Sequence, residues 1–284
     1  MKPFLKWAGG KRQIIPQIKK YISNDTLSKN AKYYEPFLGG GSLFFDLARP
    51  NSIVNDLNSE IVNVYEVIRD HPIGLINMLK NHQKNDSDEY YYKIRDLDKA
   101  ANFHKMGKVK KAARTIYLNR TCFNGLFRVN KDGHFNTPRG KYDNPLICDE
   151  ANILEISKFL KENNIIILNE DFVNACPDAC EGDYVYFDPP YDYENEDGFV
   201  SYNAQGFTRR DLERLKEFCD ELIEKGCHVL ISNNDTTFVR RTFSGSQYKI
   251  VYEIKQVSAN RNINSSGKKR ATKVKEVLIY GTRR

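Results

Sequence analysis

The sequence predicts an α/β protein whose chain is interrupted by a mostly helical insert. Residues 32–56 read as a strand, three glycines, a helix and a second strand, which is the pattern of a mononucleotide-binding βαβ unit. Residues 58–120 carry helical periodicity without a strand signal, and alternating strand and helix segments return at residue 165. With 284 residues, 40% of them hydrophobic, the chain can build one large α/β domain that carries an inserted second domain.

Each element follows from its own pattern of apolar residues. Ile14, Ile15 and Ile18 indicate a helix over residues 9–22. Apolar stripes predict further helices over 42–48, from about 58, from about 73, over 105–119 and over 208–225. Short apolar runs predict strands over 32–38, 53–54, 165–168, 182–187 and 227–231, and an antiparallel pair over 247–254 and 274–280. Residues 124–142 predict a loop or hairpin. We therefore expect residues 1–57 and 151–284 to form the α/β domain and residues 58–150 to form the insert.

The composition excludes several classes of protein. No run approaches the roughly 18 apolar residues of a membrane span, and the N-terminus lacks the apolar stretch of a signal peptide. The six cysteines form no C-x-x-C pair, and Cys176 and Cys180 have no histidine nearby. We therefore expect free thiols, no metal site and a cytoplasmic protein.

Positive charge is concentrated in two segments. The net charge is +7; residues 104–141 hold ten Lys or Arg and one acid, and residues 255–275 hold seven and no acid. A solvated basic face is the alternative, but the clustering favours nucleic acid as a partner. The second segment suits an arm that contacts phosphates. In the first, four residues suit phosphate contacts: Arg114, Arg120, Lys131 and Lys141.

The most informative motif is Asp188-Pro189-Pro190-Tyr191, directly after the predicted strand 182–187. A carboxylate, two prolines and an aromatic ring at the end of a strand make a stiff, half-apolar pocket. The carboxylate and a nearby carbonyl can accept hydrogen bonds from an exocyclic amino group while the ring stacks, which suits a nucleobase flipped out of its duplex. A turn stiffened by proline is the alternative. The acid-rich residues 192–206 that follow predict either a loop that orders on DNA or a solvated loop.

Gly39, Gly40, Gly41 and Asp56 favour a cofactor that contains a nucleoside. Glycines at a strand–helix junction let a ligand approach the backbone, and an acid at the end of the next strand usually binds ribose hydroxyls. Neither the dinucleotide fingerprint nor a P-loop is present. A tight turn followed by a helix-capping Asp is the alternative. Lys11 is unfavourable near a helix N-terminus, so it suits a carboxylate or phosphate ligand.

Taken together, these segments resemble the Dam family of DNA adenine-N6 methyltransferases over nearly the whole chain. The matching motifs occur in the same order: KWAGGKR (6–12), EPFLGGGS (35–42), ND (55–56), FNGLFR (123–128), FNTPRGKY (135–142), DPPY (188–191) and ISNND (231–235). The resemblance implies a Rossmann-like S-adenosylmethionine-dependent methyltransferase fold with an inserted, mostly helical target-recognition domain. It also implies methyl transfer to N6 of a flipped adenine in double-stranded DNA, within a GATC site.

Carried over residue by residue, the resemblance implies S-adenosylmethionine as the cofactor and assigns its contacts. Trp7 and Lys11 would hold the methionine end, and Asp56 would bind the ribose. Phe37 and Gly39 would lie in the motif loop, and Asp188 would border the cofactor. The implied catalytic residues are Asp188, Pro189, Pro190 and Tyr191. The first carboxylate and the next carbonyl would bind the adenine amino group, and the tyrosine would stack on the base.

The resemblance and the positive charge of this region together give the candidate DNA-binding residues: Lys6, Arg120, Phe123, Asn124, Leu126, Arg128, Pro138 and Arg139. The readers of the GATC site would be Lys6, Leu126, Arg128 and Pro138. Arginine can also give two hydrogen bonds to guanine in the major groove. Phe123 would wedge into the base stack, although a core aromatic is the alternative for it, and Asn124 would contact a phosphate. Arg139 departs from the aromatic residue expected after the proline.

The residues leave other functions open. The pocket alone is compatible with an N4-cytosine or RNA-adenine methyltransferase, and the fold alone with a non-catalytic DNA-binding regulator. Intact Trp7, Lys11, Asp56 and Asp188 argue against the regulator. One active site per chain makes a monomer sufficient, and a cognate restriction nuclease could be a functional partner.

Overall fold

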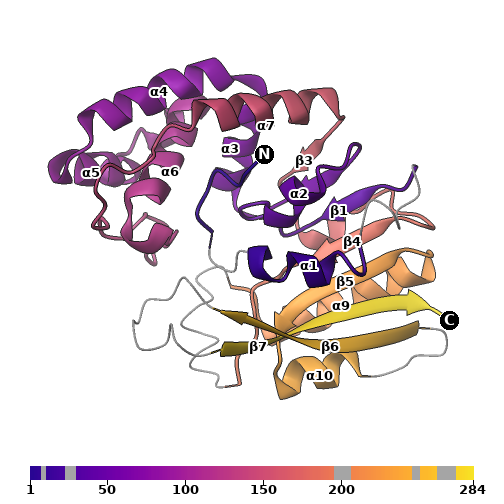
Figure 1. The fold of residues 1–284 in the computed structure, drawn as a ribbon. Coiled ribbons are helices and arrows are strands. Elements are labelled where there is room, and N and C mark those ends of the chain that lie inside the picture. Colours follow the sequence, from indigo (N-terminus) through magenta and orange to yellow (C-terminus); the bar gives the residue numbers. More distant parts are fainter. Residues whose placement is uncertain (8–10, 23–29, 195–205, 245–249, 261–272) are drawn as a thin grey trace. The chain divides into compact units, whose positions relative to one another are not determined.

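The computed structural model describes residues 1–7, 11–22, 30–194, 206–244, 250–260 and 273–284 (Figure 1). The chain forms two compact units. The first comprises Met1–Gly10, Gly39–Ala48 and Asn58–Asn169, and the second comprises Lys11–Leu38, Arg49–Leu57 and Glu170–Arg284. All residues of the expected insert belong to the first unit, together with neighbouring parts of the chain.

The structure contains a seven-stranded, mostly parallel sheet, which confirms the α/β fold. Its strands are β1 (Tyr33–Glu35), β2 (Ile53–Asn55), β3 (Ile166–Leu168), β4 (Tyr184–Phe187), β5 (His228–Asn234), β6 (Ile250–Asn260) and β7 (Lys273–Arg283). Their order is β3-β2-β1-β4-β5-β7-β6. β1 is parallel to β2 and β4, and β4 is parallel to β5. β7 is antiparallel to both β5 and β6, as predicted for the end of the chain.

The strand order reverses direction between β1 and β4. In the sheet, β2 lies on one side of β1, and β5 lies on the far side of β4. Ligands of open α/β sheets bind outside the carboxyl ends of the strands at such a switch point. Phe37 lies two residues beyond β1, and Asp188 directly follows β4. The fold therefore brings both residues to the edge of the sheet where a ligand is expected.

The last two strands are longer than predicted. Residues 255–260 and 273–275 of the expected arm are strand, paired from Lys255↔Leu278 to Asn260↔Lys273. The backbone ladder between two strands needs no apolar side chain, which is why a polar sequence can extend it. Residues 261–272 lie outside the described part of the chain.

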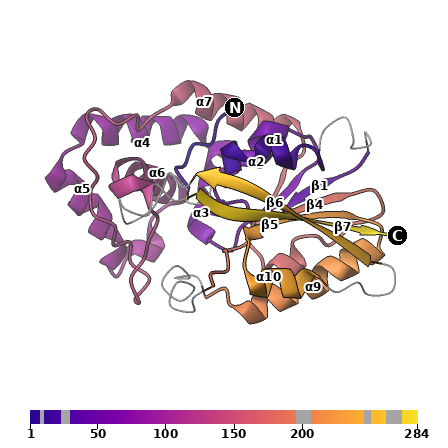
Figure 2. The same ribbon diagram turned by 60° about the horizontal axis from the view of Figure 1, so that its bottom comes forward.

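Helices of the second unit flank β5, β6 and β7. α9 (Arg209–Glu224) and α10 (Thr237–Phe243) lie on one face of these strands, and α1 (Ile15–Ile18) lies on the other (Figure 2). α9 begins at a capping box formed by Thr208 and Asp211 and buries its apolar stripe. The helix predicted over 9–22 is interrupted, because the 3-10 turn η1 (Lys11–Gln13) precedes α1. Pro16 lies in the first turn of α1, where its missing N–H costs nothing.

The first unit is mostly helical, as predicted for the insert. Its helices are α2 (Ser42–Leu47), α3 (Ser59–Asp70), α4 (Pro72–Asn85), α5 (Asp88–Arg95), α6 (Lys108–Thr121) and α7 (Glu150–Glu162), with the 3-10 turns η2 (Asp96–Lys99), η3 (Phe103–Lys105) and η4 (Phe123–Gly125). α6 is central, since residues Ala112 to Asn119 are all buried and α3, α4 and α5 pack around them (Figure 1). The sequence patterns did not predict α5 or α7.

In the parts of the chain that the structure describes, no helix is long and apolar enough to cross a membrane. No group of three His, Cys, Asp or Glu side chains among these residues could hold a metal ion. The six cysteines are free thiols.

Candidate active site and recognition segment

Three predicted site residues of the second unit meet at the end of β4. Lys11 Nζ lies 2.8 Å from Asp188 Oδ1 and 4.5 Å from the centroid of the Tyr191 ring. Tyr191 Oη donates a hydrogen bond of 3.2 Å to Glu276 on β7. Pro189 is buried beside them in the chain. The geometry therefore joins a carboxylate, a cation and an aromatic ring within one small site.

The pKa values at this site follow from its burial. The side chain of Asp188 is only 21% exposed. Burial, with a smaller contribution from the charge of Glu276, raises the pKa of Asp188 to about 6 against the opposing positive charge of Lys11. Burial, with the charges of Asp188 and Glu276, raises the pKa of Tyr191 well above its usual value. Tyr191 is therefore a neutral phenol whose O–H donates a hydrogen bond to Glu276.

Phe37 belongs to an aromatic cluster in the same unit. Its ring stacks on Phe172 at 5.6 Å and meets Phe187 and Phe207 edge-on at 6.3 and 5.8 Å between centroids. Asp56 directly follows β2, and its backbone neighbour Asn55 bonds Pro36 and Glu170 carbonyls through its side-chain amide at 2.9 and 3.0 Å. These bonds hold the carboxyl ends of β1 and β2, so the positions of Phe37 and Asp56 are fixed by the sheet.

A buried carboxylate anchors the chain immediately after the Asp-Pro-Pro-Tyr motif. Asp192 is 1% exposed, which contradicts the expectation of a solvated or mobile loop at this residue. Its oxygens contact Arg209 Nε at 2.9 Å and Thr236 Oγ1 at 2.5 Å. Its backbone N–H donates to Asn233 Oδ1 at 2.9 Å, and its carbonyl accepts from Asn234 Nδ2 at 2.5 Å. Residues 195–205 lie outside the described part of the chain.

In the first unit, the Trp7 side chain leaves no room for a side chain at Gly39 or Gly40. A Cβ on Gly39 would lie 2.7 Å from atoms of the indole ring, and one on Gly40 would lie 2.9 Å from the Trp7 Cβ. Gly39 also has φ of +49°, and Gly41 has φ of +65°, a region that favours glycine. The Gly39 carbonyl accepts a hydrogen bond of 3.2 Å from Tyr65 Oη. Trp7 and Gly39, two predicted cofactor residues, are therefore in direct contact.

Lys6 is fixed against the recognition segment, which we define as residues 122–142. The Asn119 side chain bonds both the N–H and the carbonyl of Lys6, at 2.7 and 2.8 Å, and the carbonyl of Gly125 at 3.1 Å. Lys6 Nζ lies 4.1 Å from the centroid of the Tyr142 ring. Burial lowers the pKa of Lys6, and nearby Arg120 adds to the effect. The structure thus brings Lys6 and Arg120 together, and Asn119 is a site residue that the sequence reasoning missed.

The recognition segment is a hairpin rather than an irregular loop. Val129 pairs with Phe135 in an antiparallel bridge, and Asn136 N–H donates to the Arg128 carbonyl at 3.0 Å. Arg128 is exposed, and its Nε donates to Asn136 Oδ1 at 2.7 Å. This hydrogen bond involves Nε and neither of the two terminal nitrogens of the guanidinium.

Phe123 is not the core aromatic that the alternative would require. Its side chain is 39% exposed, whereas its neighbour Cys122 is fully buried. Its N–H donates to the Pro138 carbonyl at 2.8 Å, so the two halves of the segment meet here. Asn124 has φ of +55°, a conformation that turns the chain directly after Phe123. Pro138 is exposed and Leu126 is half-buried.

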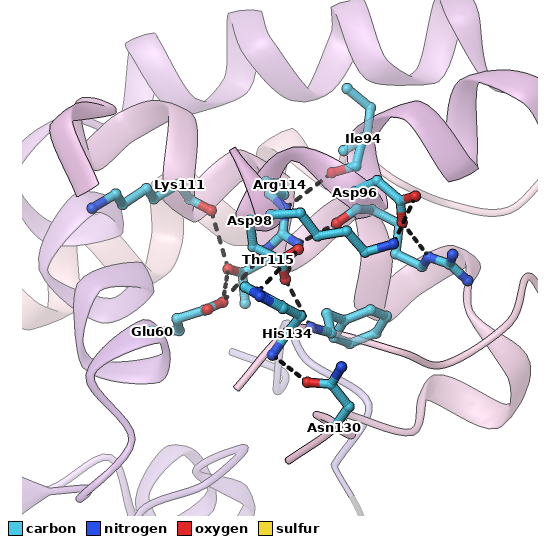
Figure 3. A network of polar contacts seen from close by, with 12 residues as sticks. Glu60, Ile94, Asp96, Asp98, Lys111, Arg114, Thr115, Asn130 and His134 are labelled. Atoms are coloured by element: carbon cyan, nitrogen blue, oxygen red, sulfur yellow. Dashed lines mark hydrogen bonds and ion pairs between the residues drawn. The ribbon is translucent and has the colours of Figure 1, made fainter. Parts of the chain in front are cut away.

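Arg114 is not a phosphate contact, which corrects the prediction from sequence. Its side chain is 2% exposed and forms an ion pair of 2.7 Å with Asp98, itself 6% exposed (Figure 3). Arg114 also donates to the carbonyls of Ile94 and Arg95 at 3.0 and 2.6 Å. Asp98 in turn accepts the Phe135 N–H at 2.7 Å. A count of basic residues identifies Arg114 as a positive charge. It cannot show that Arg114 is buried, because burial depends on tertiary packing.

The fold and site define a class of protein. A mostly parallel sheet that ends in the antiparallel strands β7 and β6 matches the fold of S-adenosylmethionine-dependent methyltransferases.

Comparison with known proteins specifies the family. Residues 7–263 match the family described as D12 class N6 adenine-specific DNA methyltransferase. The chain is 39% identical over 284 residues to the type II methyltransferase M1.LlaDCHI of Lactococcus lactis subsp. cremoris, covering 99% of this chain and 96% of that protein. It is 38% identical over 293 residues to the type II methyltransferase M.MjaIII of Methanocaldococcus jannaschii, covering 98% of each. It is 33% identical over 284 residues to a DNA adenine methylase of Vibrio cholerae, covering 98% of this chain and 95% of that protein.

The chain belongs to the D12 class of N6 adenine-specific DNA methyltransferases. This confirms the resemblance drawn from the motifs and decides against the cytosine, RNA and non-catalytic alternatives. The family acts on DNA and generally uses S-adenosylmethionine.

Proposed function

We propose that this enzyme transfers a methyl group from S-adenosylmethionine to N6 of an adenine that is flipped out of double-stranded DNA, within a GATC site. The observation that carries the proposal is the cluster of Asp188, Lys11 and Tyr191. A primary amine bonded to the carboxylate and lying over the phenol ring occupies the geometry that an adenine amino group would take. The Lys11 contacts thus show that the Asp188 carboxylate and the Tyr191 ring can engage one amino group together.

The residues present fit S-adenosylmethionine. Asp56, Phe37 and Asp188 follow three neighbouring parallel strands at the switch point of the sheet, the usual place for a nucleoside ligand. Asp56 would accept hydrogen bonds from the ribose hydroxyls, and Phe37, with its aromatic neighbours, would form an apolar wall for the adenine ring. By the sequence resemblance, Trp7 and Lys11 would hold the methionine end, and Gly39 would lie in the motif loop. The cofactor supplies a methyl group on a positively charged sulfur.

The protein side of the reaction is the preparation of the amine. The adenine amino group is a weak nucleophile because its lone pair is delocalised into the ring. Hydrogen bonds from its two N–H groups to Asp188 and to the Pro189 carbonyl would favour a pyramidal nitrogen and free that lone pair. The rigid Pro189-Pro190 pair would keep the carbonyl in place, and Tyr191 would stack on the base. Orientation and proximity supply most of the acceleration.

The recognition segment would provide DNA binding. Arg128 would read guanine through its two terminal nitrogens, because its Nε is already bonded to Asn136. Phe123, which is exposed, would fill the gap left by the flipped adenine. Lys6, Leu126 and Pro138 would contact bases. Asn124 and Arg120 would position phosphates.

The names of two relatives support a biological setting. Both are called type II methyltransferases, which favours a role in restriction–modification with a nuclease as the functional partner. One active site per chain makes a monomer sufficient for the reaction.

The proposal is tested by transfer of labelled methyl groups to a GATC duplex and to its single-base variants. We expect labelling of the GATC adenine and at least about tenfold less labelling of each variant. Asp188→Ala should abolish transfer while duplex binding is largely retained. Equal labelling of GATC and a scrambled duplex would refute the site assignment, and wild-type rates in Asp188→Ala would refute the mechanism.

A further inference from the structure

We infer that Arg139 is a positioning residue, which holds the recognition segment on the helical part of the first unit and does not contact DNA. The inference rests on the proposed function, because it assigns a role within DNA recognition. Arg139 occupies the position after Pro138 where the sequence resemblance led us to expect an aromatic residue and a DNA contact. Its contacts in the structure are of a different kind.

The guanidinium of Arg139 is held by two carboxylates at the α4–α5 junction. Nη2 lies 2.7 Å from Asp86 Oδ2, and Nη1 bonds Asp88. Asp86 also accepts a hydrogen bond of 2.7 Å from Tyr117 Oη. The Tyr117 ring stacks on His82 at 4.9 Å between centroids. Arg139 is thus the outermost member of a connected set of side chains that reaches into the core of the unit.

The backbone around Arg139 carries two residues that the proposed function places on the DNA. Arg139 pairs with Cys122 in an antiparallel bridge, and the Pro138 carbonyl accepts the Phe123 N–H at 2.8 Å. The Gly140 N–H donates to the Thr121 carbonyl at 2.8 Å, at the end of α6. A shift of Arg139 would therefore move Pro138 and Phe123 together.

Charge and burial argue against a DNA contact by Arg139 itself. The cluster of one guanidinium and two carboxylates carries a net charge of −1, so it does not attract phosphate. The Arg139 side chain is 19% exposed and Asp86 is 11% exposed. To reach a base, Arg139 would have to leave the Asp86 carboxylate buried without its only cationic partner among the described residues, which is unfavourable even though Tyr117 still donates to it. Asp88 is 85% exposed, so its pair with Arg139 contributes less.

The salt dependence of DNA binding distinguishes the two roles. Each phosphate neutralised by a side chain contributes about one to the slope of log Kd against log salt concentration. Arg139→Met should leave the slope within about 0.3 of wild type. Lys141→Met is the matched control, since Lys141 is exposed on the same segment and suits a phosphate contact. A loss of about one unit of slope in Arg139→Met would overturn the inference.

Sequence discrimination provides the second readout. Arg139→Met should lower the ratio of kcat/KM for GATC to that for single-base variants by about tenfold, because small displacements of recognition groups are costly. Arg139→Lys keeps the charge but has no planar fork to span two carboxylates, so its discrimination should stay close to that of Arg139→Met. Full recovery of discrimination by Arg139→Lys would show that charge alone matters and would contradict a clamp.

Two further experiments distinguish a positioning role of Arg139 from a folding defect and from failure of the proposed function. The double variant Asp86→Asn/Arg139→Met removes both buried charges. It should melt close to wild type and still lose discrimination, whereas recovered discrimination would count against the clamp. If wild type methylates no GATC duplex, the proposed site is wrong. Discrimination is then measured at whichever site wild type does label, and the salt slope still decides whether Arg139 contacts DNA.

Discussion

Lys11 Nζ and Asp188 Oδ1 lie 2.8 Å apart at the carboxyl end of β4. The lysine is 6% exposed and the aspartate 21% exposed, so this is a mostly buried ion pair in direct contact with the proposed base-stacking ring. The pKa of Asp188 is raised to about 6, because the effect of burial on it is larger than the opposing effect of the Lys11 charge. The proposed catalytic carboxylate therefore titrates close to physiological pH.

This relationship predicts the pH dependence of methylation. Asp188 must be ionised to accept the adenine N–H groups, so kcat/KM should fall on the acid side with an apparent pKa of about 6. Lys11→Met removes the charge that opposes the effect of burial, so it should move this acid limb to higher pH. Steady-state rates between about pH 5 and about pH 9 measure the acid limb in wild type and in Lys11→Met. A limb that stays in place or moves to lower pH in Lys11→Met would mean that another group titrates.

The same shift has a consequence for stability. Asp188 binds its proton more tightly in the folded protein, at a pKa of about 6, than in the unfolded chain, where the value is about 3.9. Its contribution to the free energy of unfolding should therefore decrease as the pH rises from about 4 to about 6. Comparing denaturant unfolding of wild type and Asp188→Asn over this range isolates the contribution, and parallel curves would contradict it.

Two glycines of the first unit should respond oppositely to alanine. Gly39→Ala places a Cβ within 2.7 Å of the Trp7 indole at φ of +49°, so we expect a loss of about 2 kcal/mol or more and weaker S-adenosylmethionine binding. Gly74 lies within α4, and a Cβ at this position would meet only Val109 Cγ1, at 3.7 Å. Gly74→Ala should stabilise the protein by about 0.5–1 kcal/mol. Thermal unfolding measures both changes, and isothermal titration measures cofactor binding.

The buried Arg114–Asp98 pair should control stability. Arg114→Met leaves Asp98 buried without its cation, and we expect a loss of about 3–5 kcal/mol in the free energy of unfolding. Lys131→Met, at an exposed residue of the hairpin, should change stability by less than about 0.5 kcal/mol. Denaturant unfolding tests both variants. Wild-type stability together with weakened DNA binding in Arg114→Met would restore the phosphate role that the structure argues against.

Asp192 should affect the rate of methyl transfer although the proposed mechanism gives it no contact with the reacting atoms. Asp192→Asn weakens the bonds to Arg209 and Thr236, so the backbone after Tyr191 loses its anchor. We expect single-turnover transfer to slow by about tenfold or more, with little change in DNA affinity. Arg214→Met is the control. Arg214 lies on α9, as Arg209 does, but it pairs with Asp171 and Asp211 instead of Asp192. A stability loss without any effect on the transfer rate would make Asp192 purely structural.

Local patterns were sufficient to predict much of the fold. Strand β4 is an uninterrupted apolar run, and β7 alternates enough apolar residues to be read as a strand, so both were predicted. α5 reads Asp-Glu-Tyr-Tyr-Tyr-Lys-Ile-Arg and buries only Tyr91 and Ile94. Its apolar stripe is too short to identify from periodicity, because a helix of this length is stabilised mainly by the residues it packs against.

The candidate site was predicted unevenly for a similar reason. Asp188 and Tyr191 stand in one short motif, and Lys11 could be picked out because a lysine near a helix start is unfavourable. Glu276 and Asp192 gave no such signal, since one lies on a strand near the end of the chain and the other begins an acid-rich segment. Their contacts with Tyr191 and Arg209 link residues 85 and 17 positions apart in the sequence.

The sequence by itself determined the family, the order of the strands along the chain and the motif at the end of β4, because these depend on short runs of residues and their order. Only the tertiary structure decided which charges are buried in pairs and which face solvent. Arg114, Arg128 and Arg139 look equivalent as basic residues of one segment. Packing makes the first a core ion pair, leaves the second exposed beside Asn136, and ties the third to two carboxylates. Burial depends on what the rest of the chain brings near a residue, and no local pattern carries that information.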